Sequence, residues 1–277
     1  MMRKALLLSA ISTALLSGCQ TVETTQAGAV GVDRDQRMMV SSEDVQASST
    51  KQYAQMMAEA KKKGVLDRNP AQVQRVQAIT KKLVSQVGAF RADAAKWPWE
   101  IHVVSLDEVN AWAMPGGKMA IYTGLIDKLK ATDDEIAAVM GHEISHSLRE
   151  HARERISRQM GTQMAVGIAG ALFGIGELGQ SLGGMVADVT LNLPNSRTHE
   201  VEADRIGVEL AARAGYDPRA AISLWEKMAK NSSGGQPPKW LSTHPSHEDR
   251  ISDLRVYAAK VMPLYQAAKG GGASAGK

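Results

Sequence analysis

The chain has 277 residues, of which 44% are apolar, and its 33 basic and 29 acidic side chains give a formal net charge of +4. This apolar fraction is ordinary for a globular protein with a buried core. The basic residues are spread along the chain without a polybasic block, so the composition argues against nucleic-acid binding. Aromatic residues make up only 4%, and 14 Met with many Ala, Leu and Val indicate a mainly helical interior.

Residues 1–18 are predicted to form a lipoprotein signal peptide. Arg3 and Lys4 precede an apolar run that is too short to be a membrane-spanning helix. The run ends in Leu-Ser-Gly-Cys, which resembles the bacterial lipobox, where cleavage leaves the cysteine as a lipid-modified N-terminus. We therefore expect lipidation at Cys19, and Gln20 after it favours an outer-membrane anchor that faces the periplasm. The alternative is an uncleaved signal followed by an ordinary buried cysteine.

The rest of the chain is predicted to contain one folded domain, residues 51–262. Residues 19–50 are rich in Ser, Thr, Gln, Gly and Asp without sustained periodicity, which predicts a flexible tether from the lipid. Residues 263–277 are predicted to form a flexible C-terminal tail. The domain is expected to begin with helices at 51–63 and 70–95, since apolar residues of the second recur at three- and four-residue steps.

Two strands are predicted next, at residues 100–106 and 118–124, from their β-branched content. The segment between them ends in Pro-Gly-Gly, a sequence that demands a turn. Together these features predict a small antiparallel sheet just before the next helix. The expected fold class is therefore α+β, mainly α, with a zincin-like helical domain and the sheet beside its active-site helix.

The helix after the sheet carries His142, Glu143 and His146 in the order His-Glu-x-x-His. Thr132 and Glu135 have the spacing of a capping box, so the sequence itself nucleates this helix. Residues four apart on a helix share a face, so the two imidazoles can converge on one metal ion while the glutamate faces a water bound to it. This arrangement is typical of zinc hydrolases.

The segment 161–189 is nearly free of charge, with Glu177 and Asp188 as its only charged residues. Its longest apolar stretch is too short to cross a bilayer unaided. One interpretation is a buried, glycine-rich helix pair. The others are a mobile apolar cover over the cleft and a membrane-facing surface.

Zinc hydrolysis needs three protein ligands and an open position for water. The chain has a single cysteine, Cys19, so the zinc site predicted here cannot be thiolate-based. A helix predicted at 196–214 offers His199, Glu200 and Glu202 as candidates for the third ligand. Helical phase places the two glutamates on opposite flanks of the apolar face and does not choose between them.

The order His-Glu-x-x-His followed by Ser-Arg-x-x-Glu-x-x-x-Asp at 196–204 resembles a known zinc peptidase family of the gluzincin clan. This family includes the CAAX prenyl proteases and their soluble bacterial and mitochondrial relatives. The resemblance extends over about residues 70–260, through Asn-Ala-x-Ala-x-Pro-Gly-Gly at 110–117 and Ser-Thr-His-Pro-Ser at 242–246. Members with a lipobox and no integral membrane helices are the most similar.

The resemblance implies that Glu200 is the third ligand of one zinc ion per chain, after His142 and His146. It also implies that Asp204 orients a ligand histidine. Glu143 would act as the general base.

His244 could stabilise the oxyanion, bind the metal as a fourth ligand in a resting state, or be a plain loop histidine. Arg197 could pair with a carboxylate near the site or be a solvated residue at the start of a helix. His151 and His247 are expected at the surface. His102 lies in a predicted strand, where packing explains it.

The family further implies an edge strand that pairs with an extended substrate backbone and accepts many sequences. The residues expected to bind substrate are Asn110, Ala111, Trp112, Ala113 and Met114.

The sequence thus predicts a zinc metalloendopeptidase that hydrolyses misfolded or envelope proteins through a zinc-bound water activated by Glu143. Its partners would be unfolded polypeptides, the membrane through the lipid, and the outer-membrane assembly machinery. The alternative from another class is a chaperone-like outer-membrane assembly or quality-control factor whose protease activity is latent. A third alternative is a zinc-free structural lipoprotein.

Overall fold

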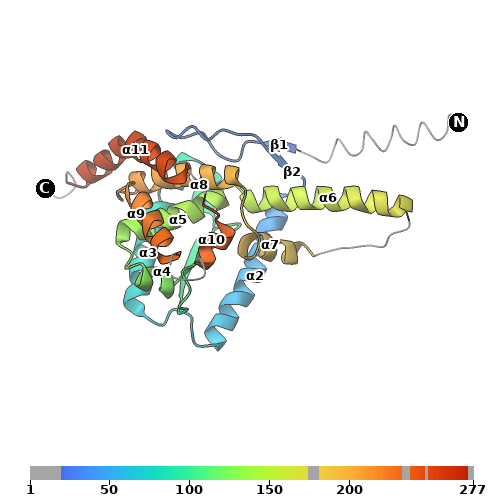
Figure 1. Ribbon diagram of the computed structural model, residues 1–277, viewed down its shortest axis with the longest axis horizontal. Coiled ribbons are helices and arrows are strands. Elements are labelled where there is room, and N and C mark those ends of the chain that lie inside the picture. Colours follow the sequence, from blue (N-terminus) through green and yellow to red (C-terminus); the bar gives the residue numbers. More distant parts are fainter. Residues whose placement is uncertain (1–19, 174–180, 233–237, 247–248, 274–277) are drawn as a thin grey trace.

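The computed structural model describes residues 20–173, 181–232, 238–246 and 249–273 (Figure 1). The strands are β1 (Gln20–Val22), β2 (Gln36–Met38), β3 (Glu100–Val104), β4 (Ala111–Met114) and β5 (Lys118–Tyr122). The helices are α2 (Ser42–Lys62), α3 (Pro70–Val84), α4 (Thr123–Lys128), α5 (Asp133–Leu148), α6 (His151–Phe173), α7 (Leu182–Leu191), α8 (Arg197–Arg213), α9 (Ala220–Ser232), α10 (Lys239–Thr243) and α11 (Arg250–Ala273), with 3-10 turns η1 (Val87–Ala89) and η2 (Asp93–Lys96). The predicted α+β, mainly α class is confirmed. Signal residues 1–18 and Cys19 lie outside the described part of the chain.

The main sheet has three strands in the order β3-β5-β4 and is mixed. β4 pairs antiparallel with β5, but β3 pairs parallel with β5, so the prediction of an antiparallel sheet is wrong for that pair. The Pro-Gly-Gly turn joins β4 to β5, with φ of 79° at Gly116 and 77° at Gly117. Because the hairpin lies between β4 and β5, β3 takes the far side of β5.

The segment predicted as a flexible tether is folded in its described part, so that prediction is wrong there. β1 and β2 form an antiparallel ribbon, and residues from Ser42 onward already belong to α2, capped by Ser41. Val30 and Val32 are buried in the main core, and the segment runs across α8 toward α11 (Figure 1). Isolated valines give no periodic signal, but burial of each contributes about 1.5–3 kcal/mol.

The predicted flexible tail also differs from the structure. α11 continues through Pro263 to Ala273. Leu264 and Tyr265 pack against the main core, and this apolar contact extends the helix beyond residue 262, the predicted end of the domain. Residues 274–277 lie outside the described residues.

α5 lies at the centre of the fold, and all of its residues from Glu135 to Leu148 are buried. It crosses α8 at two glycines. A Cβ on Gly141 would lie 2.9 Å from the carbonyl oxygen of Gly207, and a Cβ on Gly207 would lie 2.9 Å from the backbone nitrogen of His142. The two helices therefore touch backbone to backbone, which only glycine permits.

The apolar segment 161–189 divides between α6 and α7, and its residues 174–180 lie outside the described part. Met185, Val186 and Val189 of α7 are buried in a second core with α2 and β4, so α7 agrees with the interpretation as a buried helix. The C-terminal part of α6 projects from the body of the molecule (Figure 1). Among the helices of the described ranges, none combines the length and the apolar character needed to cross a membrane.

Candidate metal centre

The start of α5 is fixed by the predicted capping box. The Thr132 hydroxyl accepts a hydrogen bond from the Glu135 backbone N–H (3.2 Å), and the Glu135 carboxylate accepts one from the Thr132 N–H (2.9 Å). Lys227 Nζ lies 2.6 Å from the same carboxylate. Burial raises the pKa of Glu135, but the bonds from Lys227 and Thr132 outweigh it, and the net pKa is lowered. The motif helix therefore begins as predicted, and its phase is fixed.

Four buried side chains converge beside α5: His142, His146, Glu200 and His244, each with one donor atom within 4.8 Å of the others. The Nε2 atoms of the two α5 histidines are 3.0 Å apart. Glu200 on α8 places its carboxylate oxygens 3.5 Å from His142 Nε2 and 3.4 Å from His146 Nε2. Of the candidates for a third ligand, Glu200 therefore faces the two histidines.

This donor set fits a zinc ion. The Nδ1 atom of His142 lies 2.9 Å from Asp204 Oδ1, and the Nδ1 atom of His146 lies 2.8 Å from His151 Nδ1. With hydrogens on both Nδ1 atoms, two Nε2 lone pairs face the carboxylate of Glu200, whose buried Oε1 has no hydrogen-bond partner. Lone pairs that converge in a dry site repel one another unless a cation lies between them, and two imidazoles with one carboxylate are typical zinc ligands.

The protonation states also suit metal binding. Burial lowers the pKa of both His146 and His244 well below its usual range, so these imidazoles are neutral. Burial also lowers the pKa of His142, but the hydrogen bond to Asp204 and the charge of Glu200 outweigh it and raise the net value. Burial raises the pKa of Glu200, yet the nearby histidines and Arg250 lower it overall. His142 is thus where protons and metal would compete.

Glu143 lies beside this donor set and is only 2% exposed. Burial raises its pKa to about 7, against the lowering effects of His142, of the Trp240 indole and of the Ala113 backbone N–H. The Trp240 Nε1 donates a hydrogen bond to Glu143 Oε1 at 2.8 Å. A carboxylate with a pKa near neutrality, held in place by two donors, has the properties of a general base. No local pattern in the sequence predicts the contact between Trp240 and Glu143.

His244 follows α10 and is buried, with its Nε2 3.5 Å from Glu143 Oε1. Its ring stacks on that of Trp240, with centroids 4.6 Å apart. It therefore belongs to the site, and the interpretation as a plain loop histidine is wrong.

Arg250, at the start of α11, provides the buried positive charge of the site. Its Nη1 lies 2.8 Å from Glu200 Oε2 and its Nη2 lies 2.7 Å from Asp204 Oδ1. Arg197 does not take this place: it is exposed and pairs with Asp249 at 2.7 Å, so its predicted contact with a site carboxylate is wrong. Arg197 lies on the outward face of the first turn of α8. Arg250 was not predicted, because no local sequence pattern distinguishes it from any other arginine near the start of a helix.

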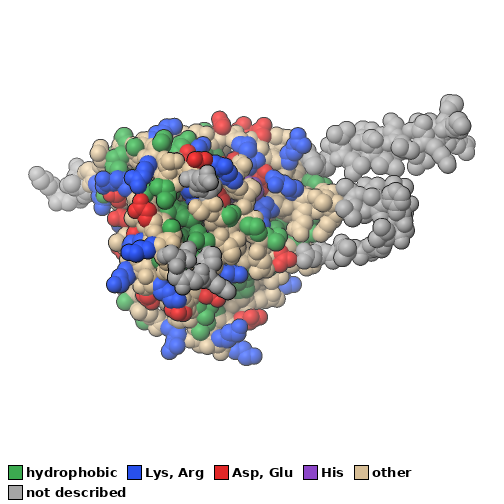
Figure 2. All heavy atoms as spheres, in the orientation of Figure 1, with side chains coloured by type: hydrophobic (Ala, Val, Ile, Leu, Met, Phe, Trp, Pro, Cys, Tyr) green, Lys and Arg blue, Asp and Glu red, His purple; other side chains and the backbone are tan. Residues whose placement is uncertain are grey.

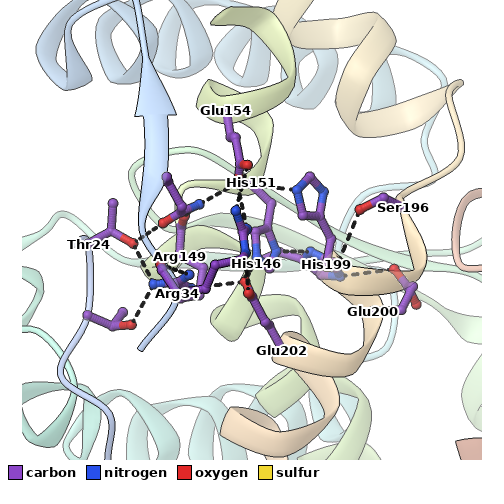
Figure 3. Close-up of polar contacts among 12 residues, drawn as sticks. Thr24, Arg34, His146, Arg149, His151, Glu154, Ser196, His199, Glu200 and Glu202 are labelled. Carbon is purple, nitrogen blue, oxygen red and sulfur yellow. Dashed lines mark hydrogen bonds and ion pairs between the residues drawn. The ribbon is translucent and has the colours of Figure 1, made fainter. Parts of the chain in front are cut away.

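His151 is buried rather than exposed, contrary to prediction, and contacts His146 (Figure 3). Glu150 before it has a φ of 50° and lies in the two-residue connection between α5 and α6. His102 is partly buried in β3 and bonded to Asp67, in agreement with a packing role. His247 lies outside the described residues.

The predicted substrate strand is β4, at the edge of the main sheet. Ala113 lines a narrow cavity of about 30 Å³ together with Glu143 and His146. Val189 and Thr190 of α7 also line this cavity. Asn110, Ala111, Trp112 and Met114 do not line this cavity, and Trp112 is buried in the second core. The cavity has room for about one or two water molecules, so this state of the structure does not admit a polypeptide.

The fold and the donor set together define a zincin-type metallohydrolase: a His-Glu-x-x-His helix crossed by a second helix that supplies a carboxylate. Residues 70–258, more than half of the chain, match the model of Peptidase family M48. The chain belongs to this family, and the resemblance inferred from the motifs is confirmed at the family level.

Several curated proteins are similar to this chain. The mitochondrial metalloendopeptidase OMA1 of Bos taurus is 37% identical over 171 residues, which are 56% of this chain and 32% of that protein. The mitochondrial metalloendopeptidase OMA1 of Schizosaccharomyces pombe is 36% identical over 160 residues, 57% of this chain and 46% of that protein. The beta-barrel assembly-enhancing protease of Escherichia coli is 30% identical over 211 residues, 71% of this chain and 41% of that protein. The chain thus spans less than half the length of these relatives.

Proposed function

We propose that the protein is a zinc-dependent metalloendopeptidase that binds one zinc ion per chain through His142, His146 and Glu200. The observation that carries this proposal is the buried convergence of these three ligands beside a glutamate whose pKa is about 7. A zinc ion bound there supplies Lewis-acid polarisation of a peptide carbonyl and of the attacking water. Glu143 takes the proton of that water at its carboxylate and later delivers a proton to the leaving amine.

We assign His244 to the same reaction or to its control. As a neutral imidazole it could donate a hydrogen bond to the oxyanion of the tetrahedral intermediate. Its place within the donor set supports the other role, a fourth ligand in a resting state. In that case His244 would have to move away before water and substrate enter.

We propose that the substrates are extended polypeptides that pair with the edge of β4, in residues 110–114. In the described part of the chain β5 is the only strand that pairs with β4, so the second edge of β4 has no strand partner. Since α7 packs beside β4 and lines the small cavity, α7 must move to admit a substrate. We propose unfolded or misfolded envelope proteins as the substrate class, with lipid anchoring at Cys19 in the outer membrane.

The second candidate function is an outer-membrane assembly or quality-control factor with latent protease activity. The small volume of the cavity favours it, because a site with room for one or two waters does not cleave polypeptides until it widens. The similarity to the beta-barrel assembly-enhancing protease of Escherichia coli supports an envelope role.

Metal analysis combined with a casein cleavage assay tests the proposed function. We expect one zinc per chain, cleavage that stops with a chelator and returns with zinc, and loss of zinc in His142→Ala. Glu143→Gln should retain zinc and lose cleavage by about 10²–10⁴-fold, the usual contribution of a general base. A zinc-free, chelator-insensitive wild-type protein would refute the proposal. If Glu143→Gln lost cleavage but fully complemented a deletion strain, the second candidate would hold instead.

A further inference from the structure

A chain of buried polar contacts extends from His146 away from Glu200 (Figure 3). His146 Nδ1 lies 2.8 Å from His151 Nδ1, and His151 Nε2 lies 3.0 Å from Glu202 Oε2. All three residues are at most 8% exposed. His151 therefore lies between a metal-facing histidine and a carboxylate, and touches both.

The hydrogens along this chain can be assigned from simple chemistry. Two ring nitrogens at 2.8 Å share one hydrogen, and His146 needs a bare Nε2 to bind a metal, so its hydrogen lies on Nδ1. His151 must then accept at Nδ1 and carry its own hydrogen on Nε2, where Glu202 accepts it. Glu202 thus selects the tautomer of His151, and His151 selects that of His146.

Glu202 is itself held by two arginines from different parts of the chain. Arg149 Nε lies 3.1 Å from Glu202 Oε2, and Arg34 Nε lies 2.6 Å from Glu202 Oε1. Arg149 also donates to the Arg34 backbone carbonyl at 2.8 Å and to the Thr25 hydroxyl at 3.2 Å. The outer end of the chain of contacts is therefore fixed by the N-terminal segment, residues 20–41.

A network that only neutralised buried charge would not need His151. Glu202 and the two arginines already pair with one another, and Arg34 makes a further ion pair with Glu154 at 2.9 Å. The residue directly before His151, Glu150, adopts a positive φ, which costs a non-glycine residue about 1–3 kcal/mol. The imidazole is thus placed at a backbone cost, and its contact with His146 is what the placement achieves.

We propose that His151 is a positioning residue for the metal ligand His146, and that Glu202, held by Arg149 and Arg34, keeps His151 in the required tautomer. This inference rests on the proposed function for the role of His146. It makes the N-terminal segment part of the metal site's support. It also assigns a role to Glu202, the candidate third ligand on α8 that does not face the metal position.

The test is zinc affinity, measured by competition with a chromophoric chelator on the full mature chain. His151→Leu removes the acceptor and should weaken zinc binding by about 10- to 100-fold. His151→Asn retains an acceptor near the position of Nδ1 and should recover most of that loss. His102→Leu is the matched control. His102 lies in β3 and bonds to Asp67, so this variant should bind zinc like the wild type.

A second arm tests the outer end of the contact chain. Arg34→Gln should weaken zinc binding less than His151→Leu does, whereas the control Arg197→Gln should leave it unchanged. Thermal unfolding of every variant without zinc separates positioning from folding, and the spectrum of the cobalt-substituted protein reports the geometry at His146. We expect His151→Leu to change that spectrum.

Wild-type zinc affinity in His151→Leu would overturn this proposal alone, provided that the wild type binds zinc and cleaves casein. Equal losses in His151→Leu and His151→Asn that follow the loss of zinc-free stability would also overturn it, in favour of a structural role. A wild type without zinc would refute the proposed function itself, and with it the role of His146.

Discussion

The two sides of the metal centre are supported in different ways, although His142 and His146 lie one turn apart on the same helix. On the first side, His142 bonds directly to Asp204, and Arg250 holds Asp204 and Glu200 together. On the second side, an additional imidazole lies between His146 and its carboxylate, and the last supports come from the N-terminal segment. The first side is therefore completed by α8 and α11, while the second also depends on Thr25 and Arg34 of the N-terminal segment.

This difference shows that a metal site can combine a short motif with a long-range scaffold. The face of the molecule shown in Figure 2 gives no indication of this combination. On the face shown in Figure 2, positive and negative side chains are interspersed, in line with the even charge distribution of the sequence. Most of the paired charges that support the site are buried beneath that surface, and Arg34 is partly exposed.

The largest effect is expected on the His142 side, from Arg250→Leu. This change leaves two buried carboxylates, Glu200 and Asp204, without their shared cation, and should destabilise the zinc-free protein by about 3–5 kcal/mol. Urea unfolding with a chelator present measures it. Arg197→Leu, which breaks an exposed pair, is the control and should cost about 0–1 kcal/mol. Equal effects of the two changes would contradict a central role for Arg250.

A change at the helix crossing should affect both sides at once. Gly207→Ala places a methyl group against the backbone of His142 and pushes α5 away from α8, at a cost of about 1–3 kcal/mol. Zinc affinity should fall with stability, because His142 and Glu200 lie on the two helices. Gly64→Ala is the control for a loss of stability alone. Gly64 has a positive φ and open space around it, so this change should destabilise the protein without a change in zinc affinity. Zinc affinity that is unchanged in Gly207→Ala would show that the crossing does not set the ligand distance.

The independence of the two sides can be measured with Asp204→Ala. Alone, it should weaken zinc binding by about 10- to 100-fold, because His142 loses its orienting carboxylate. Combined with His151→Leu, the fold losses should multiply, since the two changes act on different ligands and share no contact. The chelator competition assay gives both values. If the double variant bound zinc as tightly as the single variant with the larger loss, the two sides would act as one network.

The smallest effect is expected far from both sides, at the start of α5. The folded-state pKa of Glu135 lies below its ordinary value, so its stabilisation is fully present above the unfolded pKa of about 4.5 and is lost as pH falls through the lower folded value. Glu135→Gln should therefore lower the stability of the zinc-free protein near pH 7 and have less effect at the acid end. Unfolding series at several pH values measure this. A difference from the wild type that grows toward low pH would contradict the assignment.

The parts of the site that depend on short-range sequence patterns could be predicted from the sequence. Thr132 and Glu135 start the helix, the spacing of His142 and His146 fixes a common face, and the family resemblance pointed to Glu200. These depend on helical periodicity over a few residues, which is visible without the fold.

The parts that were missed depend on contacts between distant segments. Arg250 and Trp240 reach the site only once α10 and α11 pack, and His151 is buried by its contacts with His146 and with Glu202 of α8. The predicted antiparallel pairing of β3 with β5 was wrong for the same reason. The hairpin turn could be predicted from the sequence, but the sequence did not show that the turn joins β4 to β5.

The contact between Gly141 and Gly207 has a consequence for protein engineering. Helices that meet through ordinary side chains keep their axes about 8–10 Å apart. A backbone contact brings them closer, so that a short glutamate side chain on one helix can reach histidines on the other. Transfer of His-Glu-x-x-His to a designed helical bundle would therefore also require the transfer of the glycine pair.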